Sequence, residues 1–328
     1  VLETTSAYRR GLREDDEIVS FAGRPIGSVN QFKNVLGIYP DGWTVPLVYR
    51  REGKRQEILV ELRSLHRASE FLSKPKGPGG PPPPQRPQPN DPNKKPMPMP
   101  KPGDDPLPHG HPSDEPAAPE EWKHLFVDKP GYANYYFNEQ EQKRVLAGLN
   151  EFASLAPLTG RWKWAGQTAD NRSFVVTLAD NGLGMTIGEN LVFFHPLDDS
   201  EPQDEPPGTG GLLMALHHFK QLVTTGPKAF GLMTYVGSQP LDGRGPMVDV
   251  LTTQSGVVLT RWYFHRQDGR LLGWDSSLGN EVDPCSVRVE STADFAGRRS
   301  IANWTVRHGD NVFGTFRNAT MELQPAKP

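Results

Sequence analysis

The sequence is poor in cysteine, in hydrophobic residues and in long apolar runs, and each shortage excludes a class of protein. One cysteine among 328 residues excludes an internal disulfide framework and a zinc site built on several thiolates. No run of about 18 apolar residues exists, so no helix is predicted to span a bilayer. Hydrophobic residues make up 35% of the chain, which favours two folded regions separated by a disordered segment over one tightly packed domain.

The net charge and the first residue bear on the partners of the protein and on whether the chain is part of a longer one. The sequence holds 36 Lys and Arg against 39 Asp and Glu, a formal net charge of −3 at pH 7. This balance argues against broad binding to a phosphate backbone, so a nucleic-acid partner is not expected. The first residue is Val1, and no signal peptide precedes it. We therefore expect the chain to be the downstream part of a longer protein.

Proline is concentrated in one stretch. From Pro75 to Pro119 there are 18 prolines in 45 residues. Proline removes the amide donor and fixes φ, so neither a helix nor a strand ladder can form there. The stretch is predicted to be a disordered linker, about 140 Å long as polyproline II; a ligand for SH3-like domains is the alternative. The predicted organisation is a folded unit at 1–73, a linker at 74–120 and a second folded unit at 121–328.

Residues 1–73 are predicted to contain short helices and strands. Ser28 is placed to cap a helix, on which Val29, Phe32 and Leu36 share one face at the 3.6-residue period. Alternating apolar residues on both sides of a glycine turn predict a hairpin. The predicted elements are helices over 6–12 and 28–39, and strands over 17–22, 43–49 and 56–62.

Residues 121–328 carry a period-2 pattern over most of their length, with short polar turns between the apolar segments. This pattern predicts a large antiparallel sheet built from hairpins, with two helices covering one face. The predicted helices lie at about 138–152 and 212–223. The predicted strands lie at 160–164, 173–179, 184–187, 229–236, 248–253, 257–265, 271–276, 287–294, 301–307 and 312–321.

The run SAYRRGLREDDEIVSFAGRPI at 6–26 resembles the later part of a PDZ domain of the bacterial HtrA type. That family shows Ser-Pro-Ala, Ala-Gly-Leu, Gly-Asp, an apolar pair and a Gly-Lys/Arg-Pro turn in this order, although Asp15 replaces the usual glycine here. The resemblance covers about 65 residues. It implies a partial PDZ domain, which is a small β-barrel with two helices. With the Pro-rich linker and the mainly antiparallel β-sheet domain with covering helices, the expected fold class is α+β.

In PDZ domains a peptide C-terminus adds as a strand, and backbone amides hold its carboxylate. The loop that supplies those amides lies upstream of the matching run, so this chain would keep only the helix wall of the groove. The resemblance implies that Val29, Phe32, Lys33 and Leu36 form that wall and bind peptide or protein C-termini. For Phe32 and Leu36 the alternative is a place in the core.

The HtrA resemblance also implies a trypsin-like serine protease domain upstream. Such a protease needs its serine in a Gly-Asn/Asp-Ser-Gly-Gly setting, and no such pentapeptide occurs here. No catalytic residue is therefore assigned. The predicted function is the non-catalytic C-terminal region of an HtrA-like serine endopeptidase, recruiting substrate through the PDZ module. The family implies a bacterial periplasmic, envelope or secreted location.

A second resemblance concerns the other unit. The run WYFHRQDGRLLG at 262–273, followed by DFAG at 294–297, is similar to LolA/LolB-like lipoprotein-carrier half barrels. These hold acyl chains between a curved sheet and covering helices. The alternative function is thus a non-proteolytic envelope adaptor or carrier whose β domain binds an apolar, lipid-like ligand. An enzyme hidden in the β domain is a third possibility.

Candidate metal and nucleophile positions yield no site. The pair His109 and His111 lies in the predicted linker with no third ligand, and His217 and His218 are adjacent on a helix and point about 100° apart. No base accompanies Cys285, and the acidic residues at 198–205 lack the spacing of a calcium loop. No cofactor and no metal are expected.

Overall fold

The computed structural model describes residues 2–63, 119–197, 201–279 and 281–325. The predicted linker at 74–120 therefore lies almost wholly outside the described residues, as do His109 and His111. Two compact units are present, one formed by residues 1–64 together with 137–328 and the other by residues 65–136. The division into 1–73, 74–120 and 121–328 stays a prediction.

Residues 2–63 form a four-stranded antiparallel sheet of order β2-β1-β3-β4. Its core contains Phe21, Val45, Leu47 and Tyr49, all of them buried. The side chain of Thr5 caps the first helix and that of Ser28 caps the second. The elements are α1 (Ser6–Arg9), β1 (Glu17–Phe21), β2 (Arg24–Pro25), α2 (Val29–Leu36), β3 (Thr44–Arg51) and β4 (Lys54–Glu61).

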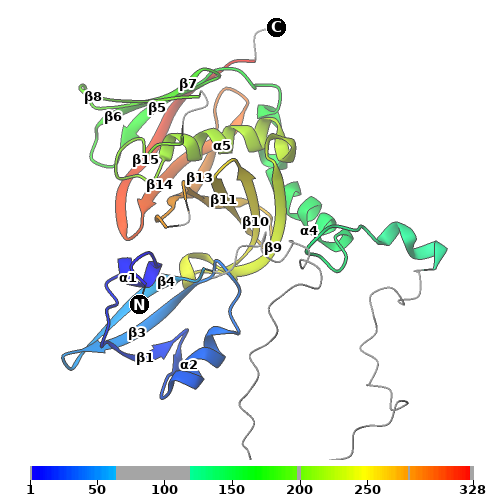
Figure 1. The fold of residues 1–328 in the computed structure, drawn as a ribbon. Coiled ribbons are helices and arrows are strands. Elements are labelled where there is room, and N and C mark those ends of the chain that lie inside the picture. The colour runs from blue at the N-terminus through cyan, green and yellow to red at the C-terminus, as the bar shows by residue number, and fades with distance from the viewer. Residues whose placement is uncertain (1, 64–118, 198–200, 280, 326–328) are drawn as a thin grey trace, which may run out of the picture. The chain divides into compact units, whose positions relative to one another are not determined.

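The predicted fold class is wrong. The small sheet is open, with β2 reduced to two residues and α1 to four, so it is not a β-barrel with two helices and a partial PDZ domain is not shown. The chain is instead dominated by one large antiparallel sheet with a few helices (Figure 1).

The large sheet has 11 strands in the order β8-β7-β6-β5-β15-β14-β13-β12-β11-β10-β9. It consists of two meanders, β5–β8 and β9–β15, and the last strand of the chain joins them by pairing with β5 in the register Leu323↔Trp162. The strands are β5 (Trp162–Thr168), β6 (Ser173–Ala179), β7 (Gly182–Ile187), β8 (Leu191–Pro196), β9 (Leu232–Pro240), β10 (Met247–Ser255), β11 (Val258–His265), β12 (Leu271–Ser277), β13 (Cys285–Asp294), β14 (Arg299–His308) and β15 (Asn311–Leu323).

Helix α5 (Leu212–Thr224) lies across one face of the curved large sheet, and we call this face the inner face (Figure 1). Its buried residues are apolar at most positions, as expected for a helix surrounded by protein. The remaining helices of this part are α4 (Tyr136–Leu146) and the 3₁₀ segments η2 (Ala147–Leu155), η3 (Gly226–Ala229) and η4 (Leu241–Gly243). No helix among the described residues has the length and apolar character needed to cross a membrane.

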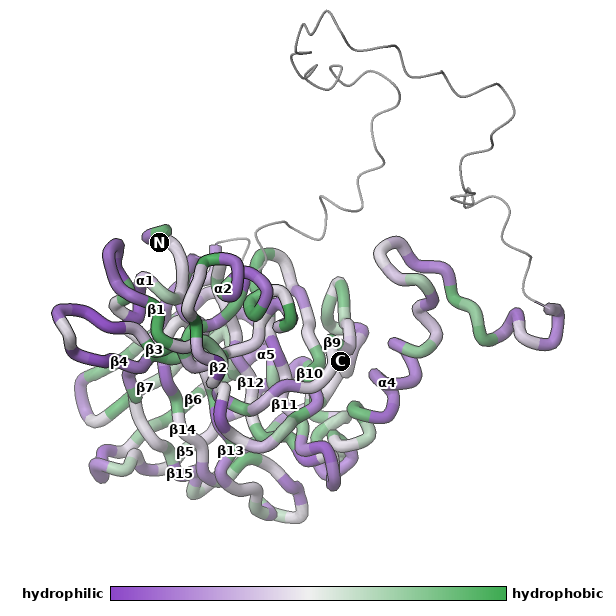
Figure 2. The backbone as a smooth tube through the Cα atoms, turned by 90° about the horizontal axis from the view of Figure 1, so that it is seen from below, coloured by the Kyte–Doolittle hydropathy of each residue, from purple (hydrophilic) through white to green (hydrophobic). Residues whose placement is uncertain are grey.

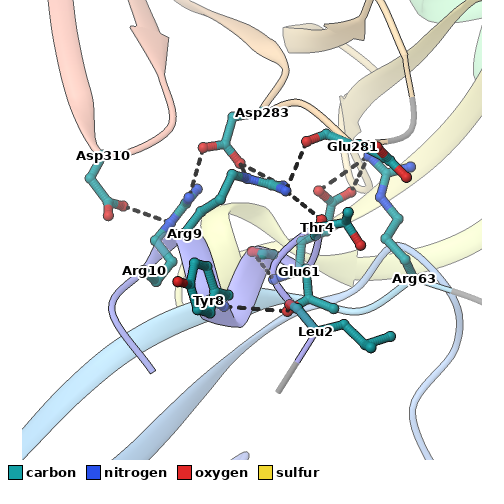
Figure 3. A network of polar contacts seen from close by, with 12 residues as sticks. Leu2, Thr4, Tyr8, Arg9, Arg10, Glu61, Arg63, Glu281, Asp283 and Asp310 are labelled. Carbon is teal, nitrogen blue, oxygen red and sulfur yellow. Dashed lines mark hydrogen bonds and ion pairs between the residues drawn. The ribbon is translucent and has the colours of Figure 1, made fainter. Parts of the chain in front are cut away.

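Within the first unit, a polar network joins helix α1 to loops that follow β12 and β14 (Figure 3). Asp283 accepts hydrogen bonds from Arg9 Nε at 3.1 Å and from Arg10 Nη1 at 2.8 Å, and Arg10 Nε lies 3.1 Å from Asp310. Such partly exposed ion pairs each add about 1 kcal/mol or less, so their contribution is mainly to orientation.

The described part of the second unit, residues 119–136, begins with η1 (Glu120–Leu125). Asn134 holds the following turn together, because its side chain accepts from Val127 N–H at 3.1 Å and donates to Leu125 O at 2.8 Å. Lys129 Nζ lies 3.7 Å from the ring centroid of Tyr135, within the range of a cation–π contact.

Candidate functional site

The inner face of the large sheet is lined by large aromatic side chains. Because successive residues of a strand point to opposite faces, every second residue of β5, β11, β12 and β14 faces α5. Five of the seven tryptophans of the chain lie there, each at most 1% exposed. They are Trp162, Trp164, Trp262, Trp274 and Trp304. Aromatic residues of this kind form a surface suited to hydrocarbon or ring-shaped ligands.

Phe219 of α5 occupies the centre of this surface. Its ring stacks on Trp274 with centroids 5.1 Å apart and an interplanar angle of 8°, and it makes edge contacts with Trp164 at 6.2 Å and Phe152 at 5.7 Å. Phe219 is fully buried. The helix thus fills the position that a ligand of the inner face would take.

Four of the five indole N–H groups have a partner, and the exception lies deep in the inner face. Trp274 Nε1 donates to Ala215 O of α5 at 3.1 Å, and Trp262 Nε1 donates to Thr253 Oγ1 at 2.9 Å. Trp164 Nε1 is buried and has no hydrogen-bond acceptor among the described residues. An unsatisfied buried donor costs about 1–3 kcal/mol, so this N–H would favour a ligand that brings an oxygen atom.

The side of α5 that faces β6–β8 is polar, and we call this contact the seam. Lys220 is 4% exposed, yet among the described residues its ammonium group has only Leu178 O at 3.3 Å and Asp180 Oδ1 at 3.7 Å. Burial lowers the pKa of Lys220, and the nearby charge of Asp180 offsets this in part. Asp180 itself is 76% exposed, so the ion pair compensates poorly for the burial of the lysine.

Two further polar atoms of the seam are unsatisfied. His217 Nδ1 and Gln221 Oε1 are buried without a hydrogen-bond partner among the described residues. Burial, together with the charge of Lys220, lowers the pKa of His217 to about 4. The seam therefore holds α5 less firmly than the aromatic contacts around Phe219 do.

A neighbouring side of α5, about 100° around the helix from His217, contacts β11 and β12 through a neutral histidine. His218 Nδ1 lies 2.9 Å from Thr260 Oγ1, which in turn lies 2.9 Å from Ser276 Oγ. Burial, with a smaller effect of His217, lowers the pKa of His218 to about 3. The buried imidazole is thus uncharged at neutral pH, as its apolar surroundings require.

The segment before α5 is fastened by one carboxylate. Asp204 accepts from the backbone N–H groups of four successive residues at 2.7–3.2 Å, namely Gly208, Thr209, Gly210 and Gly211. Gly211 has a φ of 94°, and a Cβ there would lie 2.9 Å from Leu278, so only glycine fits. At the other end of α5, Gly226 has open surroundings. The first turn of α5 is therefore fixed, whereas its last turn is not fastened in this way.

Two hollows lie away from the inner face. One, of about 90 Å³, is lined by charged side chains, among them Asp275 and Arg288 of the large sheet and Arg10 and Glu61 of residues 2–63. Burial would raise the pKa of Asp275, but Arg288 at 2.8 Å lowers it below the ordinary value. The other hollow, of about 450 Å³, lies beside Met247 and Arg266. The first is too small and too polar for an acyl chain.

The residues predicted to form a peptide groove lie on α2. Val29, Lys33 and Leu36 are exposed, with Val29 at 70% and Leu36 at 37%. Phe32 packs against the core of the small sheet, with its ring 5.2 Å from that of Phe21. Peptide binding by these four residues stays a prediction that no observation tests.

The sequence alone missed two features of the site. Strand β8 was not expected, and Lys220 was not recognised as buried, because a helical lysine is normally exposed. Cys285 is fully buried, and burial raises the pKa of its thiol. The described residues contain no group of three potential metal ligands.

Comparison with known proteins yields structural neighbours only. No family model and no curated protein matches the chain. Among solved structures, it is similar to a DUF1329 family protein from Desulfovibrio piger, at 8% identity over 57% of this chain and 94% of that one, with a TM-score of 0.35. It is also similar to a LolA superfamily protein from Nitrosomonas europaea, at 9% identity over 56% and 94%, with a TM-score of 0.35.

These findings correct the main functional prediction. Neither of these neighbours is an HtrA protease or a PDZ protein, and no family model supports either resemblance. The assignment to the C-terminal region of an HtrA-like serine endopeptidase is therefore wrong. The predicted role in proteolysis and the predicted PDZ domain are wrong with it. The LolA superfamily, to which the sequence analysis compared the second unit, is represented among the neighbours.

Proposed function

We propose that the large sheet binds an apolar, lipid-like ligand on its inner face, in place of α5. The observation that supports this most directly is the inner face itself. It is an aromatic surface on an open sheet, covered by η2 and by helix α5, whose seam is polar and partly unsatisfied. The same surface in a closed barrel would be a permanent core. Here α5, together with the neighbouring segment η2, separates it from an incoming ligand.

The energies of the two states are comparable. Helix α5 buries six large apolar side chains, worth about 9–18 kcal/mol together at ~1.5–3 kcal/mol each. A saturated chain of about 16 carbons gains ~0.8 kcal/mol per buried CH₂, or roughly 12 kcal/mol. The exchange of helix for ligand is thus close to balance, as a carrier that must also release its ligand requires.

The seam supports a route of access. Opening α5 along β6–β8 separates Lys220, His217 and Gln221 from contacts that satisfy them poorly, and it returns the ammonium group to water. Opening α5 on its β11 and β12 side would break the hydrogen bond between His218 and Thr260. The ligand therefore enters between α5 and the β6–β8 strands, and Trp164 N–H can donate to an oxygen of its polar end.

Tryptophan quenching tests the proposal. In a Trp43→Phe/Trp122→Phe variant, all remaining tryptophans lie on the inner face. We expect stearate carrying a nitroxide on its acyl chain to quench their emission saturably, while acrylamide, which stays in water, quenches little. Unlabelled stearate should reverse the effect. Emission that does not respond to the labelled stearate at concentrations below its micelle formation would refute binding on the inner face.

A matched pair of variants tests the route. Lys220→Met removes the poorly paired ammonium group of the seam, and Lys228→Met removes an exposed one on η3. We expect the first variant to slow quenching several-fold and the second to leave its rate unchanged. Equal rates in both would exclude the seam as the route, even if binding itself occurs.

The location follows from the ligand class. Lipids are available at membranes, so the proposal places the protein at a cell envelope. The HtrA basis for that location is wrong, and it now rests on the proposed ligand alone.

A further inference from the structure

The two edges of the large sheet differ in whether other groups satisfy their backbone hydrogen bonds. At β9, Asn138 of α4 imitates a neighbouring strand: it accepts from Tyr235 N–H at 3.1 Å and donates to Tyr235 O at 2.7 Å. Gln142 adds a bond to Met233 O at 3.3 Å. Figure 2 shows α4 as a largely hydrophilic helix, as suits this covering role. At the other edge, no strand of the described residues pairs with the free side of β8.

The pairing of β7 with β8 determines which backbone groups are free. Leu197 N–H donates to Asn181 O, next to the register pair Gly182↔Pro196. Hydrogen-bonded pairs alternate along an antiparallel ladder. The bonded pairs of this hairpin are therefore Leu183↔His195, Met185↔Phe193 and Ile187↔Leu191. The N–H and C=O groups of Val192 and Phe194 consequently point away from the sheet.

The side chains of this edge are apolar and exposed. Val192 is 72% exposed, Phe194 60% and Leu191 48%. From Leu191 to Pro196 the strand contains no charged residue and no lysine that would deter pairing. Natural sheets normally protect an edge of this kind with charge, proline or a covering element. Here the only proline is the last residue of the strand.

We propose that β8 pairs with β8 of a second copy of this chain, antiparallel and around a two-fold axis at Phe193. In this register Val192 lies opposite Phe194 of the partner, and each outward N–H and C=O of these residues meets a complementary group. Pro196, which lacks an N–H, lies opposite Asn190 at the end of the ladder. The edge is thus complementary to itself, which is the requirement for an isologous dimer.

The size of the contact indicates its strength. Two six-residue strands bury less than the ~800 Å² per partner that stable dimers show. The association is therefore weak and reversible, and it depends on main-chain hydrogen bonds. It joins two large sheets edge to edge through outward backbone groups of β8, which are not part of the inner face.

Sedimentation velocity of the full chain, from about 5 μM to about 1 mM, provides the first test. Val192→Pro removes an N–H that β7 does not use, whereas Val192→Thr keeps it. We expect the wild type and the threonine variant to dimerise alike. The proline variant should bind at least about tenfold more weakly, because two symmetry-related hydrogen bonds are lost. A monomer at every concentration, or equal dimerisation of both variants, overturns the proposal; the monomer would leave the edge to a strand of another protein.

Cysteine cross-linking tests the register without relying on affinity. At the two-fold axis, Phe193 faces its own copy as a non-bonded pair with Cα atoms about 4.5 Å apart, which a disulfide can bridge. Phe194 is about 8–9 Å from its own copy, which is too far. Under mild oxidation, Phe193→Cys should form a covalent dimer and Phe194→Cys should not, while the native Cys285 is fully buried. Equal cross-linking of the two variants, or none in either, overturns the proposed pairing.

Discussion

Replacing His218 with asparagine should remove a defined part of the acid sensitivity of the protein. The imidazole is 2% exposed and faces Thr260, the ring of Phe230 at 5.7 Å and the neighbouring His217. Asparagine can place a polar atom near Nδ1, so the contact with Thr260 can persist without a titrating group. The variant thus isolates the protonation of one side chain from its packing.

The magnitude follows from the pKa of His218, which is about 3 in the folded protein. In the unfolded chain the pKa is ~6.5, so between these values the unfolded state binds the extra proton and acid favours unfolding. Above about pH 6.5, His218 should not lower the free energy of unfolding. At about pH 4.5 it should lower the free energy of unfolding by roughly 3 kcal/mol, at ~1.36 kcal/mol per pH unit.

Urea unfolding followed by tryptophan emission measures this effect, because the five inner-face indoles become exposed together. The change in unfolding free energy between pH 7 and about pH 4.5 should be roughly 3 kcal/mol smaller in His218→Asn than in the wild type. Carboxylates titrate equally in both proteins and cancel in the difference. Identical pH dependences in the two proteins would show that His218 is not buried as a neutral group.

Two further substitutions test the fastening of α5. Lys220→Met should raise the free energy of unfolding by about 1 kcal/mol, because it replaces a buried charge whose ion pair with Asp180 is 3.7 Å long. Thermal unfolding measures this, with Lys228→Met as the control. A destabilised Lys220→Met protein would contradict the description of the seam. Asp204→Ala should cost about 3 kcal/mol, because four backbone N–H groups lose their acceptor. Glu201→Ala, at an exposed position, serves as its control, and similar losses in both would refute the role of Asp204.

Much of the strand pattern of the large sheet could be predicted from alternation alone. The segment predicted at 173–179 coincides with β6, because one face of that strand is buried and the other is not. Strand β8 was missed for the opposite reason. Its residues Leu-Val-Phe-Phe are apolar on both faces, so no period of two is visible. The apolar residues that leave the edge at β8 without protecting charges are thus the ones that prevented its prediction as a strand.

The seam and the fastening loop could not be predicted, because they depend on how the sheet curves around α5. The apolar positions Leu212, Leu216 and Phe219 predict a helix, but they do not show that the opposite side is enclosed too. The loop before α5 is acidic and rich in proline and glycine, a composition that by itself indicates only a surface loop. In the structure Asp204 organises its described residues through backbone groups, which composition does not reveal.

The HtrA resemblance failed for a related reason. Its shared elements are a capped helix, a Gly-Arg-Pro turn and a short hairpin, each of which satisfies a local requirement of the backbone. Local requirements of this kind recur in unrelated folds. The strand order of an open four-stranded sheet depends on contacts between distant residues, and these motifs do not specify it.

The pairing of β5 with β15 has a consequence for synthesis on the ribosome. The partner of Trp162 is Leu323, near the end of the chain, so the first meander waits for nearly the whole second meander before its edge is occupied. At ~5–20 residues per second this delay lasts roughly 8–30 s. During that time the nascent chain presents one unpaired edge of a strand with two tryptophans, a target for chaperones and a hazard for neighbouring polypeptides. Truncation before residue 311 would make that state permanent.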